Sequence, residues 1–198
     1  VGGVAAQDLS LPVGAEETFG FSRDSGAYDL PVGPWHPETG LPTRRVEGGV
    51  TIQAFRIDSV GLTPQQVLLP LRAQLQEAGF RVLLDCLAAA CGGFDFRFAT
   101  TVLPAPQMYV DLSDFHFLAM QDDSGAAVSV LASRDRTAGF VQIVRAGGGG
   151  GDIRTDAALP RGAPVGDIAR RLEADGHVVL PDLVFGTGAS TLGSGSVA

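Results

Sequence analysis

Hydrophobic and polar positions change their period several times along the chain, and each change marks an expected element. Between Val50 and Asp58 the apolar residues alternate in one phase up to Ala54 and in the opposite phase from Phe55 onward. A period of two residues is typical of a strand, and a bulge or burial on both faces would explain the change of phase. We therefore predict a strand from residue 50 to residue 58.

A helix is expected directly after this strand. Thr63 can cap its first turn, Pro64 suits the first helical position, and Gln66 can reach back to the capping residue. An apolar stripe follows at spacings of three and four residues, and Gly79 suits the left-handed position just past a helix end. The stripe consists of Leu68, Leu71, Leu75 and Ala78.

The next segment leads through a short apolar strand, which begins at Phe80, to the two cysteines of the chain, Cys86 and Cys91. Gly92 and Gly93 follow them and allow a sharp reversal of the chain. This arrangement fits a small disulfide-closed turn, whose short loop would add only about 2 kcal/mol of stability. Unpaired core thiols are the alternative.

Metal or redox chemistry at the cysteines is disfavoured by their spacing. A zinc site needs about four ligands, and the histidines at positions 36, 116 and 177 are far apart in the sequence. A redox pair is typically Cys-x-x-Cys, and the spacing here is wider. We expect no metal site and no cofactor.

Phenylalanines at positions 94, 96 and 98 alternate with Asp95 and Arg97, which predicts a further strand with one apolar face. Three more alternating or apolar segments, near residues 115–120, 128–133 and 140–145, are separated by turn residues and predict an antiparallel meander. The expected fold is therefore α+β, with an antiparallel sheet of about five strands and one main helix on a face.

The first part of the chain shows no such regularity. Residues 8–49 are rich in Gly, Pro and polar residues without a sustained helical or strand period. We expect this segment to wrap around the core and to anchor itself through Trp35. We assign residues 7–146 to one N-terminal domain.

Five consecutive glycines, Gly147 to Gly151, open a Gly- and Pro-rich segment that we interpret as a linker spanning residues 147–163. A phosphate-binding loop would need a Gly-Lys-Ser/Thr ending before a helix, which is missing here. Residues 164–198 hold one amphipathic helical segment and short strand-like runs, too few to bury their apolar faces alone. We expect them to be a truncated βα fragment, the start of a second domain.

Charge and hydropathy narrow the classes of partner. The 198-residue chain has a formal net charge of −8, which disfavours nucleic acid and anionic lipid as partners because both attract clustered Lys and Arg. No apolar run approaches the roughly 20 residues that a membrane-spanning helix needs. Val4 and Ala6 fit the −3 and −1 positions of a signal cleavage site, so residues 1–6 are interpreted as a signal-peptide remnant, with an ordinary disordered N-terminus as the alternative.

Asp111, Asp114 and His116 are the best candidates for acid/base or metal chemistry. A secreted hydrolase or metal-dependent enzyme that uses them is one alternative function, although no Gly-x-Ser-x-Gly elbow accompanies them. A periplasmic ligand-binding module, with a groove between the N-terminal wrap and the sheet, is the other. Loop capping and a solvated strand face explain the same residues without chemistry, and we expect no enzymatic activity.

Several short segments occur in an order that resembles a known family. They are Leu30–Pro34, Val46–Thr51, Gly79–Phe80, Cys86 with Cys91–Phe98, and Leu180–Leu192. The first four resemble the N-terminal periplasmic region of alphaproteobacterial OmpA-family proteins, and the last is similar to the opening strand of the OmpA-like C-terminal domain. The resemblance implies that residues 164–198 begin a truncated OmpA-like domain.

The resemblance also implies a place and a role. The expected location is the periplasm or outer membrane of a Gram-negative bacterium, and the expected role is non-enzymatic tethering or organisation of the outer membrane and cell wall. The family binds peptidoglycan through an Asp and an Arg of the C-terminal domain, and neither motif occurs in this chain. Peptidoglycan is therefore an expected partner only through that missing domain. Other envelope proteins are further expected partners. The resemblance assigns no binding residue to this chain.

Overall fold

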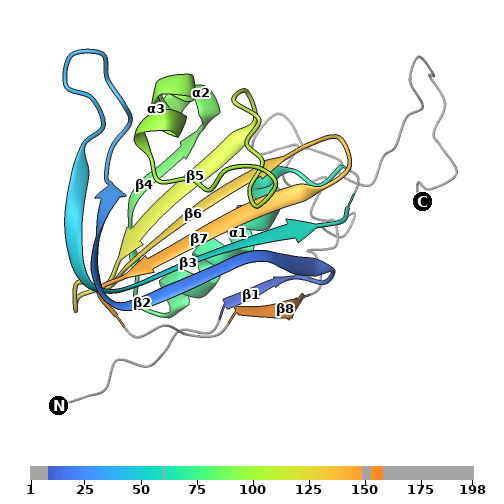
Figure 1. Cartoon of the computed structure of the whole chain (residues 1–198), viewed down its shortest axis with the longest axis horizontal. Helices are drawn as coiled ribbons and strands as arrows, with labels where there is room; N and C mark the ends of the chain where they lie inside the picture. Colours follow the sequence, from blue (N-terminus) through green and yellow to red (C-terminus); the bar gives the residue numbers. More distant parts are fainter. Residues whose placement is uncertain (1–8, 60, 149–152, 158–198) are drawn as a thin grey trace, which may run out of the picture. The chain divides into compact units, whose positions relative to one another are not determined.

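A computed structural model describes residues 9–59, 61–148 and 153–157 of the chain. Its centre is a six-stranded antiparallel sheet with the strand order β2-β3-β7-β6-β5-β4 (Figure 1). The strands are β2 (Ala15–Pro31), β3 (Thr43–Ile57), β4 (Arg81–Leu87), β5 (Phe115–Gln121), β6 (Ala127–Arg134) and β7 (Gly139–Ala146). The predicted α+β class is confirmed, with six strands in the sheet where about five were expected.

Helix α1 (Pro64–Glu77) covers one face of the sheet. The Thr63 hydroxyl accepts a hydrogen bond from the Gln66 backbone, and the Gln66 side chain accepts one from the Thr63 backbone, so the predicted capping box is confirmed. Gly79 has a φ of 89° after the helix, as its position predicts. The apolar side of α1, including Leu68, Leu71 and Leu75, packs into one core with sheet residues.

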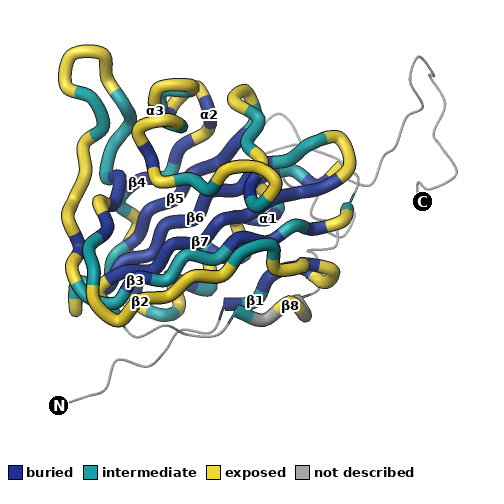
Figure 2. Tube along the Cα trace, viewed as in Figure 1, coloured by how far each residue is buried: buried dark blue, intermediate teal, exposed yellow. Residues whose placement is uncertain are grey.

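The opposite face of the sheet carries a second core, which is covered by short elements and loops. Helices α2 (Ala88–Cys91) and α3 (Gly93–Ala99) lie on it, together with apolar residues of segments 32–41 and 102–110. Figure 2 shows the central strands buried throughout, whereas the β2 edge is mostly exposed. The central strands thus lie between two apolar layers.

The burial of β3 explains why its apolar residues change phase along the strand. Its register with β7 runs without a shift from Val50 opposite Ala146 to Ile57 opposite Gly139. Val50 packs in the core below α2 and α3, whereas Phe55 and Ile57 pack in the α1 core. Burial on both faces, one of the two predicted reasons, therefore accounts for the pattern.

The irregular wrap predicted for residues 8–49 is wrong for most of that segment. Strand β2 pairs along its length with β3 as a long antiparallel hairpin, with register shifts between Glu17 and Phe19 and between Arg23 and Gly26. Residues 16–27 of β2 are mostly exposed on both faces, so this part is held by backbone pairing and shows no sustained hydrophobic alternation, whereas Tyr28 and Leu30 near its end are buried. Trp35 does anchor the following loop: its backbone N–H donates to the Cys91 carbonyl over 2.8 Å.

The strand predicted at residues 94–98 is also wrong, because these residues form α3. A spacing of two predicts a strand, but positions 94 and 98 are also one helical turn apart. In α3 the Phe94 and Phe98 rings pair on the exposed side, while Phe96 is buried. The three-stranded meander that follows, β5-β6-β7, is confirmed.

Part of the predicted linker belongs to the folded unit. Strand β8 (Ile153–Ala157) pairs in parallel with β1 (Leu9–Pro12) as a two-stranded sheet. Ser10 of β1 exchanges two hydrogen bonds with the Gln74 side chain of α1, at 2.7 and 3.0 Å. Three of the predicted segments lie wholly or partly outside the described residues. They are the signal remnant at 1–6, the second domain at 164–198, and the linker residues 149–152 and 158–163.

Candidate functional site

A disulfide joins Cys86 at the end of β4 to Cys91 at the end of α2, with a Cα–Cα distance of 5.3 Å. The predicted disulfide-closed turn is therefore confirmed. Gly92 and Gly93 follow with φ angles of 114° and 56°, which favour glycine. A Cβ atom at Gly92 would lie 2.9 Å from the Cβ of Trp35, so the turn packs tightly against the neighbouring loop.

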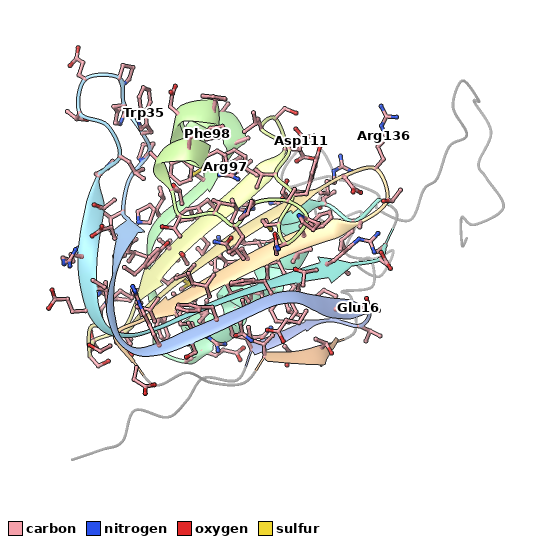
Figure 3. The ribbon with its side chains drawn as sticks, viewed as in Figure 1. Glu16, Trp35, Arg97, Phe98, Asp111 and Arg136 are labelled. Atoms are coloured by element: carbon pink, nitrogen blue, oxygen red, sulfur yellow. A yellow bond between two sulfur atoms is a disulfide. The ribbon has the colours of Figure 1, made fainter. Side chains whose placement is uncertain are left out.

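The turn presents α3 with two exposed aromatic side chains. Phe94 and Phe98 are 59% and 65% exposed, and their ring centroids are 4.4 Å apart. The guanidinium of Arg97 lies 5.3 Å from the centre of the Phe98 ring, in cation–π geometry. Figure 3 shows Phe98 and Arg97 on α3, and Trp35 on the adjacent loop. We call Phe94, Arg97 and Phe98 the α3 surface; the sequence interpretation missed it because it assigned these residues to a strand.

The three predicted acid/base or metal candidates have separate partners. His116 is buried on the α1 side of the sheet, and its Nε2 lies 2.5 Å from Oδ1 of Asp85 in β4. Oδ2 of Asp85 accepts a hydrogen bond from Arg72 of α1 over 2.6 Å. Because an ionised carboxylate can only accept, Nε2 of His116 carries the proton. No sequence pattern predicts this grouping of Arg72, Asp85 and His116.

Asp111 and Asp114 stabilise the loop before β5. Oδ1 of Asp111 accepts hydrogen bonds from the backbone N–H and the hydroxyl of Ser113, at 2.9 and 2.7 Å. Asp114 forms an ion pair with Arg134 at 2.6 Å. Within the described ranges, no group of three or more His, Cys, Asp or Glu side chains could hold a metal ion.

A polar groove lies between this loop and the β6–β7 turn. Its volume is about 660 Å³. Figure 3 shows Asp111 on the loop and Arg136 at the turn. The lining residues are Tyr109, Asp111, Arg134, Asp135, Arg136 and Thr137. The residues that line this groove are remote in sequence from the N-terminal segment that the alternative ligand-binding hypothesis used.

Both aspartates of the groove are ionised at neutral pH. Hydrogen bonds from Ser113 lower the pKa of Asp111 below its ordinary value of 3.8. Hydrogen bonds from the backbone N–H groups of Thr137 and Ala138 and from the Thr137 hydroxyl outweigh the effect of burial and lower the pKa of Asp135 in the same way. The groove therefore offers two carboxylate acceptors beside the donors of Arg134 and Arg136.

Comparison with protein families and curated proteins adds no assignment: no family model and no curated sequence matches the chain. Among the described helices, none combines the length and the apolar character needed to cross a membrane. The OmpA-family resemblance therefore stays a prediction.

Proposed function

We propose that this chain is a non-enzymatic module of a bacterial cell-envelope protein that folds in an oxidising compartment. The observation that carries the proposal is the Cys86–Cys91 disulfide. Disulfides persist in the periplasm and outside the cell, whereas cytosolic thiols are kept reduced. The OmpA-family resemblance of the surrounding segments supports the same location.

The residues around the disulfide support a structural role. Cys91 is fully buried and Cys86 nearly so, and the carbonyl of Cys91 holds the backbone of Trp35. A catalytic disulfide would need an accessible sulfur that a thiolate can attack. The bond therefore fixes the turn that supports α3.

A role in protein contacts fits the α3 surface. Phe94 and Phe98 expose most of their rings to solvent, and the folded core gains little from them in that position. Exposed aromatic side chains beside an arginine are typical of protein interfaces. Other envelope proteins are the proposed partners of this surface, and the OmpA resemblance adds peptidoglycan through a C-terminal domain.

The disulfide, on which the proposed location rests, is tested by expressing the full chain behind a signal peptide and, in parallel, in the cytoplasm. We expect protein from the periplasmic fraction to contain no free thiol and cytoplasmic protein to contain two, measured by alkylation under denaturing, non-reducing conditions. Two free thiols in the periplasmic protein would contradict the proposal.

The contribution of the disulfide to folding is a separate prediction. Replacing both cysteines, Cys86→Ser with Cys91→Ser, should lower the free energy of unfolding by about 2 kcal/mol, because the bond closes only a short loop. Urea unfolding of the wild type and the variant measures the difference. Reductant should destabilise the wild type by a similar amount and leave the variant unchanged; an equal effect of reductant on both would show that the disulfide is not its target.

A further inference from the structure

The groove beside the β6–β7 turn has the size and the rigidity of a small-molecule site. Its volume of about 660 Å³ lies within the range of roughly 300–1,000 Å³ that is typical of such sites. Its residues come from a loop and a turn that are separated in sequence but fixed to the same strands. Nothing in the function proposed above assigns a role to it.

Hydrogen bonds to the sheet hold the loop side of the groove. The Asp111 backbone N–H donates to the Ser133 hydroxyl of β6 over 2.9 Å. The Gln142 side chain of β7 accepts from the Leu103 N–H and donates to the Thr101 carbonyl, both at 2.8 Å. The loop is thus bound at several points along its length.

The turn side is held equally well. Oδ1 of Asp135 accepts hydrogen bonds from the backbone N–H groups of Thr137 and Ala138, each at 2.7 Å. Arg134 is oriented by its ion pair with Asp114. Because both sides are already ordered, a ligand would bind with little cost in conformational entropy.

The charges of the lining select against a charged ligand. Two arginines and two ionised aspartates line the groove, so their formal charges cancel. An anion would meet Asp111 and Asp135, and a cation would meet Arg134 and Arg136. A neutral ligand rich in hydroxyl groups can use both kinds of side chain, since carboxylates accept from hydroxyls and guanidinium groups donate to them.

Tyr109 adds a flat apolar surface to this polar lining. Its side chain is 42% exposed, and its ring lies against Phe140, with the centroids 5.8 Å apart. The C–H face of a pyranose ring packs well on such a supported aromatic surface, while its hydroxyls point outward to polar neighbours. An open groove with one exposed aromatic ring and balanced charges suits a sugar better than a hydrophobic molecule.

We propose that this groove binds a neutral saccharide. Tyr109 stacks on one sugar ring, and Arg136 and the free carboxylate oxygens of Asp111 and Asp135 bind its hydroxyls. This site is distinct from the α3 surface and from any peptidoglycan contact of a C-terminal domain.

The test is a titration of the full ¹⁵N-labelled chain, followed by NMR, with neutral trisaccharides of glucose, mannose and N-acetylglucosamine. At least one should give saturable shifts confined to residues around 109–111 and 134–137. Inorganic phosphate and glutamate are the charged probes, and neither should saturate these shifts. Failure of every trisaccharide at up to about 20 mM, which corresponds to very weak binding, would overturn the proposal, as would saturation by phosphate.

Variants separate the groove from the remainder of the surface. Tyr109→Ala should weaken saccharide binding at least tenfold, whereas Tyr109→Phe should keep it within about threefold, because it retains the ring. Phe98→Ala removes an exposed aromatic ring elsewhere and should leave the affinity unchanged. Arg136→Gln, at an exposed position, should weaken binding without loss of fold. Unchanged affinity in both Tyr109→Ala and Arg136→Gln would contradict the assignment.

Discussion

Replacing Phe96 by Ala should lower the free energy of unfolding by about 3–5 kcal/mol, the usual cost of truncating a buried aromatic side chain. The Phe96 ring is almost fully buried; it packs edge-on against Phe117 and stacks near Phe115, with centroid distances of 4.9 and 6.1 Å. Its loss would leave a cavity between α3 and β5. Urea unfolding followed by circular dichroism measures the change.

The neighbouring phenylalanines of the same helix are the matched control. Phe94→Ala and Phe98→Ala each remove a ring that is mostly exposed, so each should cost no more than about 1 kcal/mol, including the loss of their mutual contact. A loss from Phe94→Ala as large as that from Phe96→Ala would show that the side chains of α3 are oriented differently.

These three residues also show where sequence reasoning failed. A period of two residues predicts a strand, yet the Gly92–Gly93 pair with positive φ angles directs the chain into a helix. The spacing of four between Phe94 and Phe98 fits a helix as well, and the alternation alone cannot decide between the two. The disulfide turn just before them was predictable, because two cysteines close in sequence and a glycine pair mark it without any tertiary information.

Strand β2 shows which kind of strand a sequence pattern does not predict. Where the side chains of a strand are buried in a core, as on both faces of β5, the sequence shows an apolar run, and the meander was predicted from such runs. Where a strand is held mainly by backbone hydrogen bonds to a neighbour, as β2 is by β3, side chains leave little trace. The edge of the sheet was therefore missed while its centre was found.

The candidate sites depend on contacts between distant residues. His116 was noticed because of its residue type, but its partner Asp85 lies 31 positions earlier on a strand whose pairing had not been predicted. The groove joins Tyr109 and Asp111 to a turn more than twenty positions later. Only the register of β4, β5 and β6 brings these groups together.

Asp85→Ala should lower the free energy of unfolding by about 2–3 kcal/mol at neutral pH. Removing it leaves His116, whose side chain is only 6% exposed, without the acceptor of its Nε2 proton, and it leaves Arg72 without its counterion. Removing one partner of a fully buried ion pair typically costs about 3–5 kcal/mol. We expect a smaller loss here, because the Asp85 side chain is 21% exposed and solvent screens part of the interaction. Asp123→Ala, which breaks the exposed Arg81–Asp123 pair, is the matched control and should cost less than about 1 kcal/mol.

The stabilisation by Asp85 should also depend on pH. Burial alone would raise its pKa, but hydrogen bonds from His116 and Arg72 and their electrostatic interaction with the carboxylate outweigh burial and hold the pKa below its ordinary value of 3.8. Because the pKa is lower in the folded state, the stabilisation is present above the ordinary value and is lost as pH falls through the folded-state value. The stability difference between the wild type and Asp85→Asn, measured by urea unfolding, should therefore shrink as the pH falls from about 5 toward 3. A difference that persists unchanged at pH 3 would mean that the charge of Asp85 is not what stabilises this contact.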